Sequence, residues 1–308
     1  MNKNNIFSNK IAVVFLAAIV STLWGTLFPM IKIGYRVFEI DSANVASILL
    51  FAGLRFLICG IILVAAVSGK EKRVKLPDKN EFKAVFVVGM LTVVVHYAFT
   101  YTGLSLADSS KSSVLKQIGF LVVPCIAFLF RKDDKFSIFK ILAAVLGFMS
   151  VITINLDGMN LIFGAGEILI ILASFSSMFG QMASKNAYDK YDPTYIVAYS
   201  QLFGGIVLVL AGLLFGGGIG VVSWQSIGVL GYICFASITA NILWNTLIKY
   251  NNMSKLAVLK AMDPLFASLF SAILLSENVL KPSYLISVLL IISAMMVSNY
   301  SDKKEKRL

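Results

Sequence analysis

The chain is predicted to be an all-α integral membrane protein whose ten transmembrane helices form two inverted five-helix repeats. Three observations support this prediction. Of 308 residues, 58% are hydrophobic and only 14% are charged. Ten apolar stretches, each about as long as a bilayer is thick, fill nearly the whole chain. A segment of the fourth stretch recurs in the ninth with its lysine retained.

The composition excludes a soluble domain, whose surface needs roughly a quarter of charged residues. The mean hydropathy is +0.85. About 20 apolar residues, at a rise of about 1.5 Å each, cross a hydrocarbon layer of about 30 Å. The expected spans are residues 11–33, 42–67, 82–105, 109–130, 136–155, 164–186, 194–215, 224–249, 255–276 and 282–300.

The positive charges are distributed along the chain in the pattern that membrane insertion produces. The net charge is +11, a value that by itself also suits nucleic-acid binding. With the N-terminus inside, most basic residues fall in inner loops and tails, and the outer loops keep little beyond Arg36 and Lys281. Short basic loops stay cytoplasmic during insertion. We therefore expect a multi-pass plasma-membrane protein with both termini in the cytoplasm, in contact with lipid and with no nucleic-acid partner.

The second half of the chain repeats the first. SKSSVLKQIGFLV, from Ser110, and SKLAVLKAMDPLF, from Ser254, share six residues at equal spacing, including Lys116 and Lys260. Short apolar segments also match by composition alone, but lysines are rare inside membranes. We expect one repeat over residues 1–157 and a second over residues 158–308. Because each holds five spans, the two copies enter the membrane in opposite directions, which is the basis of alternating access.

Several short motifs accompany this repeat. They are the pair Trp24-Gly25 followed by Lys32, the LRF segment with Arg55, the prolines Pro124 and Pro264 at the ends of the helix-four and helix-nine segments, and the acidic residues Asp133 and Glu277 after them. Over nearly its whole length the chain resembles the drug/metabolite transporter superfamily, and within it the EamA-type ten-helix carriers. The resemblance implies helices one to four and six to nine around a central cavity, with helices five and ten outside.

Members of that family move amino acids, other small metabolites, drugs, sugars or sugar phosphates, often by exchange or with a proton gradient. The resemblance therefore leaves the substrate open. The segment VLKAMDPLF, Val258 to Phe266, also resembles the helix that carries an anion-binding lysine in plastid sugar-phosphate translocators. The chain lacks the Lys-Arg pair that those translocators place on one helix.

Charged residues inside the spans are the strongest candidates for a binding site. Each costs about 2.5–3.5 kcal/mol at mid-bilayer on insertion scales. Inverted symmetry places Lys116 and Lys260 opposite one another, with Arg55 nearby, and the three are expected to bind a substrate carboxylate or phosphate. The alternative is structural: Lys260 pairs with Asp263 three residues on, Lys116 snorkels or bonds to carbonyls, and Arg55 clamps helices together.

Proton coupling has its own candidates. His96 is the only histidine in the chain and could titrate during transport. Glu167, Asp108 and Asp263 are rival proton sites. The structural alternatives are a histidine bonded to a neighbouring helix, and acidic residues that favour helix N-termini.

Aromatic and amide side chains complete the predicted pocket, where they would stack on a substrate or bond to it. Besides the charged residues, the pocket set is Trp24, Tyr97, Tyr101, Gln117, Gln181, Asn241, Trp244 and Asn245. Each of them also suits a packing or interface role.

These features favour a secondary active transporter for a small anionic or zwitterionic metabolite, an amino acid or related carboxylate. The sequence shows no Walker loop, metal-ligand cluster or nucleophile elbow, so we expect no enzyme, cofactor or metal. The alternatives are an exporter of drug-like or aromatic compounds, a sugar-phosphate/phosphate exchanger, and a non-transporting scaffold. The expected partners are the small-molecule substrate and a proton or counter-substrate, for a monomer or homodimer.

Overall fold

The computed structural model describes the chain except for residues 1–5, 42, 72–75, 107–114, 117, 120–121, 124–125, 127–135, 156–163, 261, 276–281 and 306–308. Among the described residues all regular secondary structure is helical. Along the chain the helices are α1 (Lys10–Val37), α2 (Val45–Glu71), α3 (Lys79–Gly89), α4 (Val95–Leu106), α7 (Ile138–Asn155), α8 (Ala165–Tyr188), α9 (Pro193–Leu214), α10 (Trp224–Tyr250), α11 (Met253–Lys260), α12 (Asp263–Leu275) and α13 (Pro282–Glu305).

Six helical stretches of the described chain are long and apolar enough to cross a bilayer. They are Lys10–Val37, Val45–Gly69, Lys79–Leu104, Ala165–Tyr188, Pro193–Leu214 and Trp224–Tyr250. Helices α7 and α13 contain shorter apolar stretches. The predicted spans one to three, five to eight and ten each coincide with helical structure to within a few residues. Most of the fourth span lies outside the described residues, as do Pro124, Asp133 and Glu277.

Capping side chains fix where helices begin. Asp192 accepts hydrogen bonds from the N–H groups of the second and third residues of α9, and Pro193 fills the first position. At the start of α3, Asp78 and Glu81 form a reciprocal capping box. These carboxylates satisfy N–H groups that the first turn of a helix leaves without partners.

The ninth span differs from the prediction of one continuous helix over residues 255–276. Helix α11 ends at Lys260 and α12 begins at Asp263, with a turn at Met262 between them. Pro264 explains the interruption, because proline has no N–H to donate to the carbonyl of Lys260, as a continuous helix would require. The chain therefore changes course near the repeated lysine.

The third span is helical throughout but not uniform. Between α3 and α4 the residues Met90–Val94 form a π-helical turn, η2. The hydroxyl of Ser176, on α8, donates to the carbonyl of Leu91 in this turn at 2.7 Å. Such π-turns leave backbone carbonyls available to neighbouring elements and recur at functional sites.

Helices α2 and α9 approach so closely that their contact requires glycine. A Cβ added at Gly60 would lie 2.4 Å from the backbone nitrogen of Leu202, and one added at Gly205 would lie 2.3 Å from that of Leu57. Helices in lipid associate through such close packing of small residues, because lipid is as apolar as the side chains it replaces.

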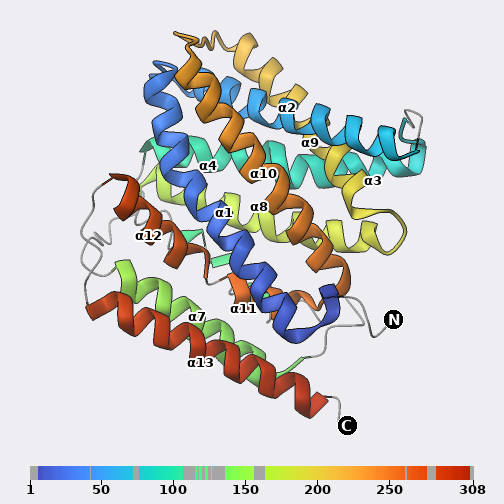
Figure 1. The fold of residues 1–308 in the computed structure, drawn as a ribbon, viewed down its shortest axis with the longest axis vertical. Coiled ribbons are helices and arrows are strands. Elements are labelled where there is room, and N and C mark those ends of the chain that lie inside the picture. Colours follow the sequence, from blue (N-terminus) through green and yellow to red (C-terminus); the bar gives the residue numbers. More distant parts are fainter. Residues whose placement is uncertain are drawn as a thin grey trace.

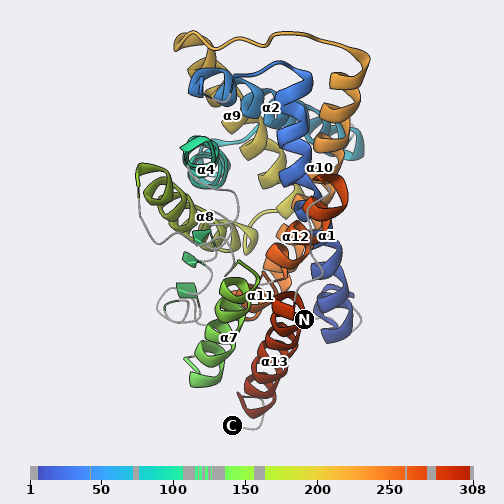
Figure 2. The same cartoon turned by 90° about the vertical axis from the view of Figure 1, so that its left-hand side faces the viewer.

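Helices α7 and α13 lie side by side at one end of the molecule, as the green and red ribbons of Figures 1 and 2 show. Ser150 and Ser287 join them by reciprocal hydrogen bonds, each hydroxyl donating to the other residue's carbonyl at 2.9 Å. Helices α1 and α10 pack against each other in the other part of the fold.

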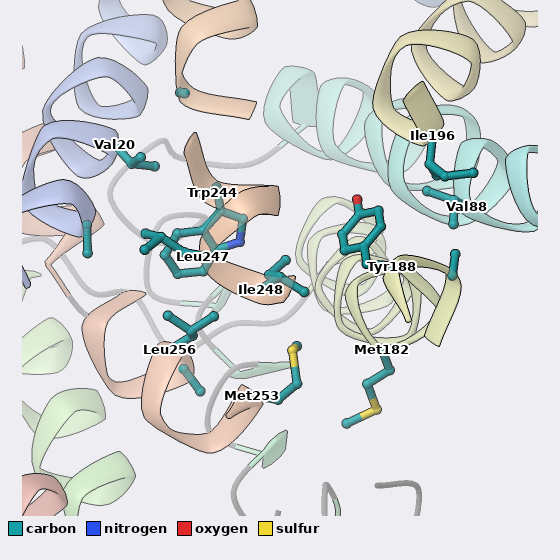
Figure 3. Close-up of a cluster of buried hydrophobic side chains, with 14 of the residues drawn as sticks. Val20, Val88, Met182, Tyr188, Ile196, Trp244, Leu247, Ile248, Met253 and Leu256 are labelled. Atoms are coloured by element: carbon teal, nitrogen blue, oxygen red, sulfur yellow. The ribbon is translucent and has the colours of Figure 1, made fainter. Parts of the chain in front are cut away.

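A large cluster of buried apolar side chains joins α1, α8, α10 and α11. Figure 3 shows Trp244 and Leu247 of α10 near Leu256 of α11, with Tyr188 of α8 on the far side of α10. Trp244 is 4% exposed. This cluster fixes one wall of the site described next.

Candidate substrate site

The break between α11 and α12 places opposite charges at adjoining helix ends. Lys260 ends α11 and Asp263 begins α12. The Nζ atom of Lys260 lies 2.7 Å from Oδ2 of Asp263, and Oδ1 accepts a hydrogen bond from the hydroxyl of Ser21 on α1. A cation at a helix C-terminus and an anion at an N-terminus both suit the helix dipole. This is the local pairing that the sequence offered as the alternative to substrate binding.

Two tryptophans enclose the same ammonium group. Nζ of Lys260 lies 3.2 Å from the ring centroid of Trp24, on α1, and 4.7 Å from that of Trp244, on α10. The two indoles meet edge to face with centroids 5.6 Å apart. The indole N–H of Trp244 donates to the amide oxygen of Gln181, on α8, at 2.9 Å. We call Trp24, Trp244 and Asp263 the ammonium cage.

Arg55 forms a second buried cationic centre. Arg55 is 1% exposed. Its Nε donates to the hydroxyl of Ser237, on α10, at 2.9 Å, and one terminal nitrogen donates to the hydroxyl of Tyr101, on α4, at 3.0 Å. The rings of Phe56 and Tyr97 lie 4.8 and 5.7 Å from the guanidinium carbon. Within the described residues no carboxylate pairs with this guanidinium.

Lys116 lies half-buried in the fourth predicted span, of which the structure describes only short pieces. Its carbonyl accepts a hydrogen bond from the hydroxyl of Ser174, on α8, at 2.7 Å. Of the other two cations that the sequence singled out, Lys260 contacts Asp263, and Arg55 contacts Ser237 and Tyr101.

The sequence model of the EamA-like transporter family matches residues 11–156 and, a second time, residues 164–299. The chain belongs to the EamA-like transporter family. It is therefore a multi-pass membrane protein of the drug/metabolite transporter superfamily, as the sequence motifs predicted.

Two similar proteins carry the name of transporters. An uncharacterized transporter of Archaeoglobus fulgidus is 25% identical over 290 residues, which cover 91% of this chain and 84% of that protein. The uncharacterized transporter YvbV of Bacillus subtilis is 23% identical over 305 residues, covering 96% and 94% of the two chains. Enzymatic activity is not a property of this family.

A protein of known crystal structure shares the fold. It superposes with a TM-score of 0.71 over 91% of this chain and 98% of its own, at 17% identity. At that identity the likeness establishes the architecture alone. The EamA-like fold thus supplies the frame on which these side chains are placed.

Two of the proton sites predicted for this EamA-like protein, His96 and Glu167, form hydrogen bonds with backbone groups. His96 places Nδ1 2.9 Å from the carbonyl oxygen of Ala173, on α8. Since a carbonyl only accepts, Nδ1 carries the proton. Glu167 accepts from the backbone N–H of Gly164 in the first turn of α8. Asp108 lies outside the described residues.

The predicted amides of α10 bond within their own helix. Asn241 donates to the carbonyl of Ser237, and Asn245 donates to that of Asn241, both at 2.8 Å. The amide oxygen of Asn245 accepts from the hydroxyl of Tyr188, on α8, at 2.6 Å. Gln117 lies outside the described residues.

Sequence reasoning missed Ser21, Ser237 and Tyr188 as members of this site. Ser21 holds Asp263, Ser237 holds Arg55 and Tyr188 holds Asn245. One signal was available: residues 237, 241 and 245 recur every four positions and so form one polar face on α10. The partnership of Ser21 with Asp263 spans nearly the whole chain, and no local pattern indicates it.

Proposed function

We propose that this EamA-like protein is a secondary active transporter that moves a small anionic or zwitterionic metabolite across the cell membrane by alternating access. Amino acids and related carboxylates are the first candidates. The observation that carries the proposal is that two cationic side chains, Lys260 and Arg55, lie buried within the predicted membrane spans, where charged residues are rare.

The described interior holds more positive than negative charge. The predicted spans contain three cationic side chains, Lys116, Lys260 and Arg55, and Lys260 pairs with the carboxylate of Asp263. A charged side chain inside the membrane is costly and usually marks a substrate or ion pathway. An anionic group on the substrate reduces this imbalance, whereas a cationic drug increases it. The balance therefore favours anions and zwitterions over cationic drugs.

Alternating access requires two half-structures that exchange roles, and the contact between α2 and α9 is consistent with an inverted repeat. Gly53 approaches Val209 just as Gly205 approaches Leu57. The same offset in the sequence separates Gly53 from Gly205 and Leu57 from Val209. A two-fold relation between the halves would produce such reciprocal contacts. The double match to the family supports the same reading.

The interrupted ninth span also supports a carrier. Transporter sites near mid-membrane are commonly built from discontinuous helices, whose ends present charge and free backbone groups to the substrate. The break between Lys260 and Asp263 has this form. We further propose that the protein lies in the plasma membrane with both termini in the cytoplasm, on the charge distribution of its loops.

A ligand screen followed by flux measurements tests the proposal. Purified protein is screened by thermal shift against amino acids, carboxylates, phosphate esters and cationic amines, since a ligand that binds the folded state raises Tm. Stabilising compounds are then assayed for counterflow in proteoliposomes. We expect hits among anions or zwitterions, and loss of counterflow in Lys116→Ala and Lys260→Ala.

The matched control is Lys32→Ala, because Lys32 also lies within a membrane span but is exposed on α1. We expect this variant to transport as the wild type does. Full counterflow by both Lys116→Ala and Lys260→Ala, or hits confined to cationic amines, would discard the proposal.

A further inference from the structure

We propose that the ammonium cage is a binding site for an organic ammonium group, in which the side chain of Lys260 stands in for the ligand. The cage has the three components that recognise such a cation. Trp24 and Trp244 present ring faces to Nζ at 3.2 and 4.7 Å, and Asp263 supplies the counter-charge at 2.7 Å. Aromatic faces with a carboxylate are the usual means of holding ammonium ligands.

Hydrogen bonds with Ser21 and Gln181 hold the walls of the cage. Ser21 donates to Oδ1 of Asp263, whereas Oδ2 is the oxygen 2.7 Å from Lys260. Gln181 fixes the indole of Trp244 through its N–H. Because the supports come from α1 and α8 and the walls from α1, α10 and α12, we expect the cage to keep its shape without the lysine. A pair that served only to neutralise Lys260 would need the carboxylate alone.

Charge balance then defines the ligand, and this step rests on the proposed transport function. A ligand with only an ammonium group would displace Lys260 and leave its charge unpaired in a buried site. A ligand with only an anionic group would draw Lys260 away and leave Asp263 unpaired. A molecule with both groups satisfies both residues, because its ammonium enters the cage while its anionic group pairs with the displaced Lys260.

Because Lys260 is tethered to the chain, we expect simple amines not to compete with it in the wild type. An attached side chain acts at a high effective concentration, on the order of millimolar or above, so a weak free amine does not displace it. The class of substrate is therefore a small molecule that carries an ammonium group close to a carboxylate or another anionic group.

Chemical rescue of a lysine variant tests the cage directly. The chain has three tryptophans, and Trp224 is 89% exposed, so a Trp224→Phe background leaves only the two cage indoles to report by fluorescence. In that background Lys260→Ala empties the cage, and n-butylammonium matches the missing side chain. We expect saturable change in emission and a Tm rise of about 2–4 °C at about ten times the Kd.

The controls separate the cage from nonspecific amine effects. The parent with Lys260, and the double variants Lys260→Ala/Asp263→Asn and Lys260→Ala/Trp24→Leu, are expected to show no saturable response. A response equal in these controls, or none in Lys260→Ala, overturns the proposal. If Lys260→Ala is not recovered folded, Lys260→Gln is titrated in its place, with the same two outcomes.

Failure of the cage and failure of the transport proposal give different results. Binding of n-butylammonium to Lys260→Ala is measured without any flux assay, so its result does not depend on transport. A transported substrate that lacks an amino group would refute the substrate class while leaving both the cage and the carrier intact. Absence of any flux, with rescue observed, would remove the carrier and keep the cage.

Discussion

Replacement of Asp263 by asparagine removes a carboxylate that pairs with Lys260. Asparagine keeps nearly the same shape and can still accept the hydrogen bond from Ser21. The ammonium would remain between the two indoles but without its counter-charge at 2.7 Å. The variant therefore isolates the contribution of charge at the helix break.

The magnitude follows from burial. The side chains of Lys260 and Asp263 are 8% and 16% exposed, so the pair is buried rather than solvated. Removing one partner of a buried pair costs about 3–5 kcal/mol. Because Asp263 keeps some exposure and the indoles still contact the cation, we take about 3 kcal/mol. At about 2 °C per kcal/mol for a large chain, Tm falls by about 6 °C.

The assay is thermal unfolding of purified protein, with Glu39→Gln as control because Glu39 is an exposed acidic residue. The double variant Lys260→Met/Asp263→Asn is expected to recover most of the loss, since two neutral partners leave no unpaired charge. A Tm for Asp263→Asn equal to that of the control would refute the reasoning, as would a double variant less stable than both single variants.

Three further predictions concern packing, protons and Arg55. Gly60→Ala is expected to lower the free energy of unfolding by about 1–3 kcal/mol, because its Cβ would meet the backbone of Leu202. Gly69→Ala, which has open space around its Cβ, is expected to leave Tm unchanged or to raise it slightly. His96→Gln is expected to leave the pH profile of transport unchanged, because Nδ1 of His96 bonds to the carbonyl of Ala173. A shifted profile would support His96 as a proton carrier. Arg55→Met is expected to abolish transport and Arg55→Lys to retain part of it; equal transport by Arg55→Met and wild type would contradict a role for the charge.

Much of the fold could be predicted from the sequence, because bilayer thickness sets a length that apolar runs must meet. The ends of α8, α9 and α10 lie within a few residues of the predicted spans. No sequence pattern indicates the π-turn at Met90–Val94. The hydrogen bond that the turn forms, from Ser176 to the carbonyl of Leu91, joins residues far apart in the sequence. The Asp-Pro step at Asp263 is visible in the sequence, but the length of the mostly apolar stretch around it favours one continuous helix.

The sequence indicated which residues to consider for the site, but not which side chains they contact. Rare charges inside spans identified Lys116, Lys260 and Arg55, since the cost of burying them demands a reason. Their partners depend on which helices adjoin, so neither Ser21 beside Asp263 nor Ser237 beside Arg55 could be inferred locally. The pairing of Lys260 with Asp263 itself followed from their spacing.

Counterflow of the best stabilising ligand into proteoliposomes tests the central claim most directly, because that claim places substrate recognition on buried positive charge. Wild type, Lys32→Ala and the double variant Lys116→Ala/Lys260→Ala are reconstituted at equal amounts of folded protein. The account predicts equal counterflow for the first two and none above empty liposomes for the third. Undiminished counterflow by the double variant would contradict it.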